Sequence, residues 1–171
     1  MIETKDLILR RGAFDDWKAM YENVWRHPQT ARYMLWDVTT SEEDARARME
    51  RTIRWQSEHH AYFVEEKSSG QCIGFAGFIE LAPGVYEDTG VALGPDFVGR
   101  GYGKQVLNGL LSIAFDQLNG QVFIGSARPE NAASIALQRS CGFHYTHSES
   151  RTDPRNGDEY TLNFYEKRRN V

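Results

Sequence analysis

The chain has 171 residues, of which 40% are hydrophobic and 12% aromatic, and its formal net charge is -4. This length allows one sizeable hydrophobic core and is short for two ordinary domains, so we expect a single domain over residues 1–171. The scattered charges exclude the basic face that nucleic acid or an anionic membrane requires, and no apolar stretch is long enough to span a bilayer. Because the N-terminus lacks a signal-peptide pattern and the chain has only two cysteines, we expect a cytoplasmic protein without disulfides.

The first half of the chain predicts a strand, two helices and a three-stranded meander. The strand covers residues 7–11, and the helix after it carries apolar residues at helical spacing, namely Phe14, Trp17, Met20, Tyr21 and Val24. A second helix is expected to begin at a cap near Thr40 and Ser41 and to run to Glu58. The meander strands follow over residues 61–65, 72–80 and 85–93, separated by turns at 67–70 and 82–84.

The second half predicts alternating helices and strands. A glycine-rich loop leads into the clearest helix of the sequence, residues 102–118, which Asn119 and Gly120 end. A strand is expected over 122–127, a short helix over 132–140, and two strands near 143–148 and 160–166. This order predicts an α/β (α+β) domain built on one mixed sheet.

The segment that carries chemistry is the glycine-rich loop before that clearest helix. Gly99, Gly101 and Gly103 alternate there, and glycine lets the backbone adopt positive φ and lets a ligand approach the main chain. The free N–H groups of the first helical turn lie at the positive end of the helix dipole, which suits a phosphate group. Arg100 and Lys104 would add charge-assisted hydrogen bonds. The loop therefore predicts an anion site, and the alternative is that its glycines only shape a strand-to-helix turn.

Two common phosphate-binding loops do not fit this segment. A Walker-type loop needs Gly-Lys-Ser/Thr after its four spacer residues, whereas Gly99 is followed by Arg100 and Gly101. The dinucleotide fingerprint needs a third glycine at the position of Lys104, and no acidic residue stands at the expected distance after a second strand.

The loop instead resembles the pyrophosphate-binding loop of the GNAT acetyltransferases, whose pattern is Gln/Arg-x-x-Gly-x-Gly/Ala. Gly101 and Gly103 occupy its glycine positions, and Val98 stands where Gln or Arg is usual. The RimJ/RimL branch of this superfamily often carries an apolar residue there. Three further pieces match that branch in the correct order: residues 3–10 resemble its opening strand, residues 128–134 with 141–143 its Pro-x-Asn-x-x-Ser…Gly-Phe element, and residues 88–91 its acidic residue two before a glycine.

This resemblance implies a fold and an activity. The fold would be a GNAT-like single domain, with a mixed, mostly antiparallel twisted sheet flanked by helices and a splayed central pair formed by strands 85–93 and 122–127. The activity would be direct transfer of an acetyl group from acetyl-CoA to a primary amine in a ternary complex, without a metal. The acceptor would be a protein N-terminal α-amine or a small molecule such as an antibiotic or a polyamine. The remaining alternative is a non-catalytic acetyl-CoA-binding module, and the chain is expected to be a monomer or a homodimer.

By the same resemblance, the cofactor contacts fall on the strand 85–93, the glycine-rich loop and one asparagine: Val91, Ala92, Leu93, Gly99, Arg100, Gly101, Tyr102, Gly103, Lys104 and Asn131. Main-chain groups of the strand would pair with the pantetheine arm as a peptide strand would, while its side chains are expected in the core. The loop would hold the pyrophosphate. Asn131 is also expected to cap the helix 132–140 by accepting a hydrogen bond from the amide of Ser134.

The resemblance assigns catalysis to Asp88 and Ser134. Neighbouring strand residues face opposite sides, so only one of Glu87 and Asp88 points into a cleft, and the register with Gly90 favours Asp88 as the group that organises removal of the amine proton. Slippage by one residue would reverse this choice, and a solvated strand end with bound water as the base is the alternative. Ser134 is expected either to protonate the leaving thiolate or to be an ordinary solvated helical serine.

Other reactive side chains are assigned no chemistry. Cys141 ends a helix just before Gly142, without a histidine and an acid around it, so it is not expected to act as a nucleophile. The histidines show no metal-ligand spacing with cysteines or acids, and no metal is expected. Four aromatic residues lie in the N-terminal helical region that walls the acceptor site in the GNAT superfamily, although most of them are expected in the core: Trp25, Tyr33, Trp36 and Trp55.

Overall fold

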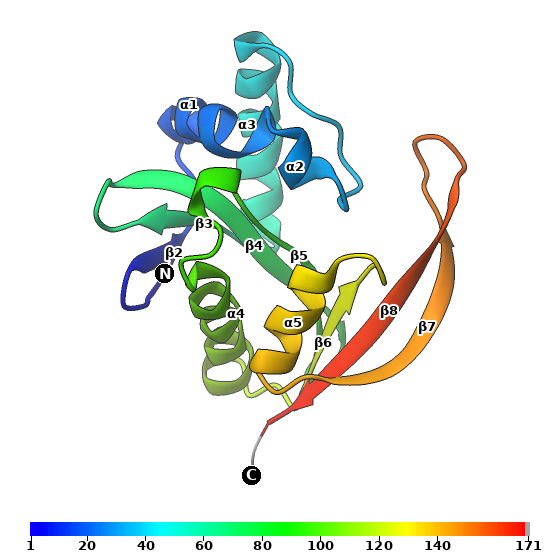
Figure 1. Cartoon of the computed structure of the whole chain (residues 1–171). Coiled ribbons are helices and arrows are strands. Elements are labelled where there is room, and N and C mark those ends of the chain that lie inside the picture. Colours follow the sequence, from blue (N-terminus) through cyan, green and yellow to red (C-terminus); the bar gives the residue numbers. More distant parts are fainter. Residues whose placement is uncertain (170–171) are drawn as a thin grey trace.

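Within residues 1–169, the part of the chain that the computed structural model describes, eight strands form one sheet (Figure 1). Their order across the sheet is β1-β2-β3-β4-β5-β6-β8-β7, and every neighbouring pair is antiparallel except β5 and β6. The bounds are β1 (Ile2–Glu3), β2 (Leu7–Arg10), β3 (His60–Glu66), β4 (Gln71–Ala82), β5 (Val85–Leu93), β6 (Val122–Ala127), β7 (His144–Thr152) and β8 (Glu159–Arg168). This arrangement confirms the predicted mixed, mostly antiparallel sheet.

The helical segments follow the predicted order, with short turns at their ends. They are a 3-10 turn (Phe14–Asp16), α1 (Trp17–Met20), a π-helical turn (Tyr21–Trp25), α2 (Pro28–Ala31), α3 (Glu42–Glu58), a 3-10 turn (Pro95–Phe97), α4 (Tyr102–Ser112), a π-helical turn (Ile113–Gln117) and α5 (Ala132–Ser140). The predicted cap of the second long helix is confirmed, because the Ser41 hydroxyl accepts the Asp44 N–H at 3.1 Å. Among residues 1–169, no helix is both long and apolar enough to cross a bilayer.

Helices cover both faces of the sheet, with α1 and α3 on one side and α4 and α5 on the other (Figure 1). The alternation of side chains along β3 makes this two-sided burial possible. Tyr62 and Val64 join the core cluster beneath α4, whereas Phe63 packs with Trp25 and Met49 beneath α3. Full burial of one such side chain contributes about 1.5–3 kcal/mol, so both helical layers are firmly attached to the sheet.

The central strands β5 and β6 separate soon after they begin. Only the first three residues of each strand pair with one another. β5 then continues to Leu93 and β6 to Ala127 without a backbone partner across the gap. A bulge bends β5 at this point, since the register against β4 skips Thr89, and Gly90 takes a φ of 116°. The predicted splay between parallel strands 85–93 and 122–127 is therefore confirmed.

Three elements differ from the sequence prediction. The strand β1 precedes the predicted first strand because Thr4 closes a tight turn, in which its N–H donates to the carbonyl oxygen of Leu7 at 2.9 Å. The short helix α2 begins at Pro28, where only a polar stretch was predicted. The hairpin of β7 and β8 is longer than predicted. Its strand β7 lies at the edge of the sheet, and all of its residues but Glu149 are exposed. Such a strand has no hydrophobic alternation to detect.

Candidate active site

Where the backbone pairing between β5 and β6 ends, side chains form the hydrogen bonds to the β6 backbone. The Ser126 N–H of β6 donates to Oδ2 of Asp88 on β5 at 3.0 Å, and its carbonyl oxygen accepts from Nε2 of Gln138 on α5 at 3.1 Å. The same Gln138 amide donates to the hydroxyl of Ser134 at 3.2 Å. In this network side chains, and not the β5 backbone, satisfy the N–H and carbonyl groups of Ser126, so the wedge between the two strands stays open.

The two neighbouring carboxyl groups of β5 lie on opposite faces of the sheet. Tyr86 is buried in the core beneath α4, so strand alternation turns Glu87 away from α4 and Asp88 towards it. Burial raises the pKa of Asp88 to about 7, against the opposing effect of the Ser126 hydrogen bond. Burial also raises the pKa of Glu87 above its usual range. Asp88 is thus suited to exchange protons near neutral pH.

The N-terminus of α4 is open, as the glycine pattern predicted. Gly101 is the N-cap with a φ of 76°, Gly99 has a φ of 77°, and no side chain of residues 1–169 caps the helix. A Cβ added at either glycine would meet nothing within 4 Å, so a ligand can reach the backbone there. At Gly103 an added Cβ would lie 3.2 Å from Cδ2 of Leu137, so this glycine also permits close packing of α4 on α5.

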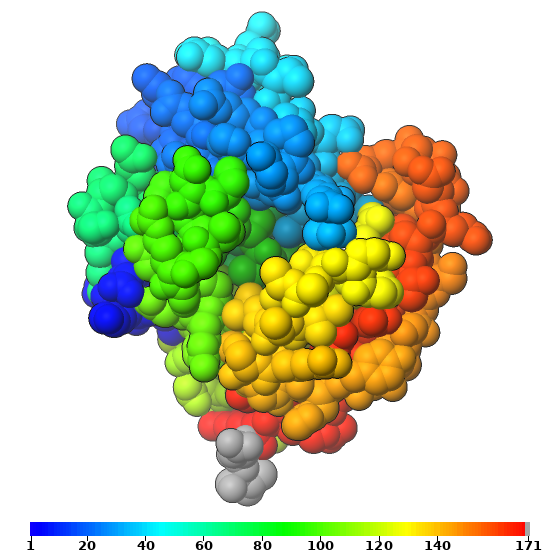
Figure 2. Space-filling model, viewed as in Figure 1, coloured from blue at the N-terminus to red at the C-terminus, as the bar shows by residue number. Residues whose placement is uncertain are grey.

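The side chains of the loop are held mainly by one carboxylate. Glu66 of β3, which is 6% exposed, accepts a hydrogen bond from the Tyr102 hydroxyl at 2.8 Å and pairs with Arg100 at 3.4 Å. Hydrogen bonds from Tyr102 and Ser69 lower the pKa of Glu66, so it remains ionised. Lys104 is exposed on the first turn of α4. Figure 2 shows the surface recessed between this loop (green) and the beginning of α5 (yellow).

The two remaining groups of predicted cofactor residues lie on either side of the wedge. Val91, Ala92 and Leu93 pair with β4 on one edge and face the gap to β6 with the other. Asn131 caps α5, since its Oδ1 accepts the Ser134 N–H at 3.1 Å, which confirms the predicted cap. The predicted cofactor residues therefore gather around one opening, which extends from the N-terminus of α4 to that of α5.

A pocket of about 620 Å³ lies on the other face of the sheet. Thr89 of the β5 bulge forms part of its wall. Most of the lining side chains are aromatic or apolar, and the full set is Trp25, Leu35, Trp36, Arg48, Thr52, Trp55, Gln56, Ala61, Phe63, Phe75, Ala76 and Thr89. Three of the four aromatic residues of the N-terminal helical region thus line it. The expectation that most of the four lie in the core is wrong, because only Trp25 is fully buried. Tyr33 lies elsewhere, with its hydroxyl 3.4 Å from the carbonyl oxygen of Glu130.

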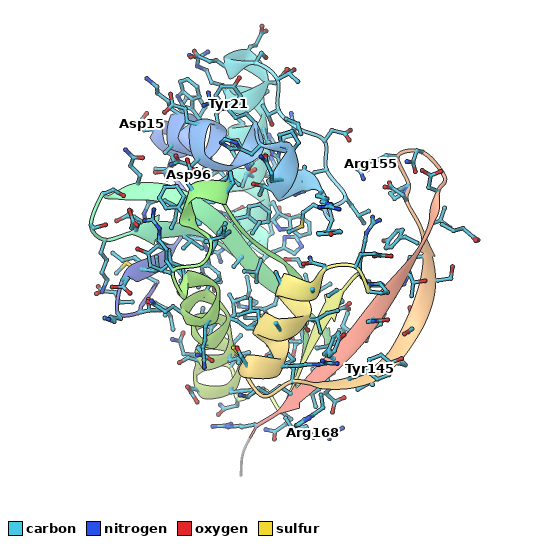
Figure 3. All side chains as sticks on the ribbon, viewed as in Figure 1. Asp15, Tyr21, Asp96, Tyr145, Arg155 and Arg168 are labelled. Atoms are coloured by element: carbon cyan, nitrogen blue, oxygen red, sulfur yellow. The ribbon has the colours of Figure 1, made fainter. Side chains whose placement is uncertain are left out.

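The tip of the β7–β8 hairpin reaches the loop between α2 and α3. Arg155 extends from this tip (Figure 3), pairs with Asp37 at 2.9 Å and donates to the carbonyl oxygen of Met34 at 3.2 Å. Asp153 pairs with the Arg155 guanidinium at 2.7 Å. The hydrogen bonds that Arg155 donates to Asp153 lower the pKa of Asp153 to about 2. The hairpin and the loop are therefore joined beside the pocket.

Sequence reasoning missed several of these residues. Gln138 reads as an ordinary helical residue, and its buried contact with β6 depends on tertiary packing. The sequence pattern assigns no role to Arg48 or Arg155, whereas the structure places Arg48 at the pocket and Arg155 at the hairpin tip. Glu66 ends a strand, and the sequence holds no signal that it anchors the loop. Among residues 1–169 no group of His, Cys, Asp and Glu side chains forms a metal site.

The acetyltransferase (GNAT) domain family matches residues 6–144. The chain belongs to this family. It is therefore an acetyl-CoA-dependent N-acetyltransferase, as the glycine-rich loop and its flanking motifs predicted.

Individual relatives agree with this assignment. The N-alpha-acetyltransferase RimI of Mycobacterium tuberculosis is 36% identical over 87 residues, which cover 49% of this chain and 52% of RimI. The chain thus matches about half the length of RimI. An acetyltransferase (GNAT family) from Bacillus anthracis has the same fold, with a TM-score of 0.84 at 20% identity over 98% of this chain and 97% of that one. RimL, a ribosomal L7/L12 alpha-N-protein acetyltransferase in complex with coenzyme A, has a TM-score of 0.80 at 22% identity over 96% and 95% of the chains.

The residues around the wedge fit the cosubstrate of this family. The uncapped N-terminus of α4 offers backbone N–H groups in open space, which suits a pyrophosphate. The free edge of β5 offers main-chain groups to an amide-containing arm. Oε1 of Gln138 is buried over Gly125 of β6 without a hydrogen-bond donor among residues 1–169.

Proposed function

We propose that the chain, as a single domain over residues 1–171, transfers the acetyl group directly to a primary amine bound in the pocket lined by Phe75 and Thr89. The observation that carries this proposal is the wedge itself. α4 covers one face of the sheet and the pocket lies on the other, and the wedge opens at the β5 bulge, where Thr89 lines the pocket. A cosubstrate and an acceptor can thus approach the same point from opposite faces, which supports direct attack without an acyl-enzyme.

The reaction needs few groups from the protein. A neutral amine attacks the thioester carbonyl, and a free main-chain N–H at the wedge edge of β5 donates to the developing oxyanion. The proton of the amine then leaves to a base, and coenzyme A leaves as a thiol. Acetyl-CoA supplies the activated acyl group. The acceptor is a protein N-terminal α-amine, as the names of RimI and RimL suggest for those proteins, or a small-molecule amine.

We assign the removal of the amine proton to Asp88. A pKa near 7 suits a general base at neutral pH, and the carboxylate lies at the vertex of the wedge, held by Ser126. Glu87 is the alternative base, because it lies on the same face as the pocket and also has a raised pKa. The two candidates are distinguished by separate substitutions, described below.

We assign protonation of the thiolate to Ser134. Its hydroxyl oxygen already accepts a hydrogen bond from Gln138, so its own proton is free to be donated elsewhere. The hydroxyl lies one turn into α5, at the opening where the cofactor residues gather. The backbone of residues 99–104 is assigned to the pyrophosphate, and Val91, Ala92 and Leu93 to the pantetheine arm.

The experiment that tests the proposal follows thiol release from acetyl-CoA over a panel of amines. The panel contains peptides with varied N-termini, amino acids, polyamines and aminoglycosides, and mass spectrometry identifies the acetylated product. We expect thiol release to require an amine and to yield its N-acetyl form in equal amount. Acetyl-CoA binding without acetylation of any amine would overturn the proposal. A covalently acetylated protein that forms without an amine would exclude direct transfer.

A further inference from the structure

The pocket contains one charged side chain among its described lining residues, Arg48 of α3. Its guanidinium lies against two indole rings, 4.8 Å from the ring centroid of Trp25 and 4.3 Å from that of Trp36. Nη1 donates to Oγ1 of Thr39 at 3.0 Å and to the carbonyl oxygen of Asp37 at 3.5 Å. Both of these acceptors are neutral, so the positive charge of Arg48 has no counter-charge in its hydrogen-bonded shell.

The neighbouring acids do not supply that counter-charge. Across residues 1–169 Arg48 forms no ion pair with any carboxylate, although Asp37 and Asp44 line the hollow on its other side. Asp37 pairs with Arg155 at 2.9 Å, and Asp44 accepts the hydroxyl of the α3 N-cap at 2.8 Å. Burial, reinforced by the nearby charge of Arg51, lowers the pKa of Arg48 to about 10, so it stays protonated at neutral pH. A half-buried cation without a partner is costly to retain unless a ligand pairs with it.

The rest of the pocket indicates what kind of molecule carries the anion. Phe75 and Ala76 form part of its floor, and they pair with Ala92 and Val91 of β5. The pocket therefore borders the segment assigned to the cosubstrate. Its volume lies within the range of about 300–1,000 Å³ typical of small-molecule sites, and its walls are aromatic. Nε1 of Trp36 is a further buried donor without an acceptor among residues 1–169.

We propose that the acceptor of this enzyme carries a carboxylate or phosphate group that pairs with Arg48, on an aromatic or apolar body that packs between the indole rings. This inference rests on the proposed function, because it takes the pocket to be the acceptor site. A planar guanidinium that already lies against aromatic faces can pair with both oxygens of a carboxylate. Polyamines and aminoglycosides are disfavoured, because the described lining offers them a cation and no acid.

Matched acceptors test the proposal on the unmodified protein. 4-(Aminomethyl)benzoate and its neutral amide, 4-(aminomethyl)benzamide, share the amine and the ring and differ in charge. Phenylalanine and phenylalaninamide repeat the comparison at shorter spacing, and Ser-Glu and Ser-Gln peptides repeat it on a peptide. We expect kcat/KM to be about 10- to 100-fold higher for the anionic member of at least one pair, the range of a charge-assisted hydrogen bond. The pair that responds identifies a small acid or an acidic peptide as the source. Equal values in all three pairs would overturn the proposal.

Substitution of Arg48 then tests whether this residue causes the preference for the anionic acceptor. Arg48→Met removes the charge and keeps an unbranched stem, and we expect it to abolish the preference for the anionic member while turnover of the neutral member persists. Arg51→Met is the matched control, since Arg51 lies one turn further along α3, lines only the neighbouring hollow, and has the same charge. An undiminished preference in Arg48→Met, or an equal loss in Arg51→Met, would contradict the role of Arg48.

A binding measurement separates this inference from the proposed function. 4-Methylbenzoate and 4-methylbenzamide have no amine, so their effect on tryptophan fluorescence or melting temperature needs no turnover. We expect the acid to bind the acetyl-CoA-saturated protein at least about tenfold more tightly than the amide. Tighter binding of the acid by a protein that acetylates no amine would support the inference and contradict the proposed function. Acetylation of amines together with equal binding of acid and amide would support the proposed function and contradict the inference.

Discussion

Replacement of Asp88 by asparagine tests the assignment of the base most directly. The side-chain carbonyl oxygen that Asp88→Asn introduces can still accept the Ser126 N–H, whose donor lies 3.0 Å from Oδ2 of the native carboxylate, so the wedge should keep its shape. The substitution removes the group that takes the proton. General-base assistance is worth about 100- to 10,000-fold in rate, which corresponds to about 3–5 kcal/mol of barrier. We expect kcat to fall by that factor while the affinity for acetyl-CoA is unchanged.

The pH dependence provides a second, independent measurement of the same group. With a pKa of about 7, Asp88 is mostly protonated at pH 6 and mostly ionised at pH 8. Deprotonation of the amine raises kcat/KM with pH in both proteins, and the ionisation of Asp88 should make the rise of the wild type between these two values about tenfold larger than that of Asp88→Asn. Thiol release under saturating acetyl-CoA gives both profiles. Glu87→Gln is the control on the opposite face.

Three results would contradict this reasoning. If Glu87→Gln alone slows the enzyme and reduces the rise, Glu87 is the base and Asp88 only positions β6. If neither substitution slows turnover more than a few-fold, the proton leaves through bound water. If Asp88→Ala and Asp88→Asn weaken acetyl-CoA binding equally, the carboxylate is needed for more than its hydrogen bond to Ser126.

The raised pKa of Asp88 also has a consequence for stability. The native state keeps this proton to about pH 7, whereas an unfolded aspartate loses it near pH 3.8. The native state therefore binds more protons between these values, so the contribution of Asp88 to stability falls as the pH rises through that window. Asp88→Asn cannot ionise, so its melting temperature relative to the wild type should increase from pH 4 to pH 7. A difference that stays constant would show that the pKa is not raised.

The remaining predictions concern the cosubstrate, the leaving group and the hairpin. Gly101→Val should abolish the rise in melting temperature that acetyl-CoA causes, whereas Gly157→Val, at an equally open glycine with a φ of 82° in the hairpin tip, should leave it intact; equal loss in both would point to backbone strain alone. Ser134→Ala should lower kcat about 100-fold or more at unchanged KM for acetyl-CoA if its hydroxyl protonates the thiolate, and an unchanged kcat would show that Ser134 is an ordinary helical serine. Arg155→Ala should raise KM for the acceptor several-fold without changing the KM for acetyl-CoA, because it frees the hairpin tip from the α2–α3 loop; an equal rise in both would indicate general destabilisation.

The parts of the site that sequence reasoning recovered are those built from neighbouring residues. The glycine-rich loop, the caps at Ser41 and Asn131, and the strand that borders the wedge each depend on side chains within a few positions of one another. Their backbone requirements, such as positive φ at Gly101, leave a direct trace in the residue type. The splay of β5 and β6 was predicted as well, although through the resemblance to the GNAT family.

The parts that were missed depend on contacts between distant positions. Gln138 supports the wedge through a bond to Ser126, twelve residues earlier, and Arg48 lies against indole rings from two other segments. A polar residue on a helix has the same pattern whether it faces solvent or a gap in the sheet. The bulge that turns Thr89 towards the pocket is also set by pairing with β4, which no local sequence rule fixes.

The arrangement of charges around the wedge has a chemical consequence for the acceptor. A lysine-like primary amine has a pKa near 10.4 in water and an N-terminal α-amine a pKa of about 7.7–8.0, and only the neutral form attacks a thioester. An aromatic pocket disfavours the ammonium form by desolvation, and the positive charge of Arg48 disfavours it further. An anionic group on the acceptor offsets the guanidinium charge and fixes the molecule, while the amine is directed towards β5. Desolvation by the pocket thus lowers the share of proton removal that Asp88 or Glu87 must supply, and we expect the anionic group to contribute tighter binding and a fixed position for attack.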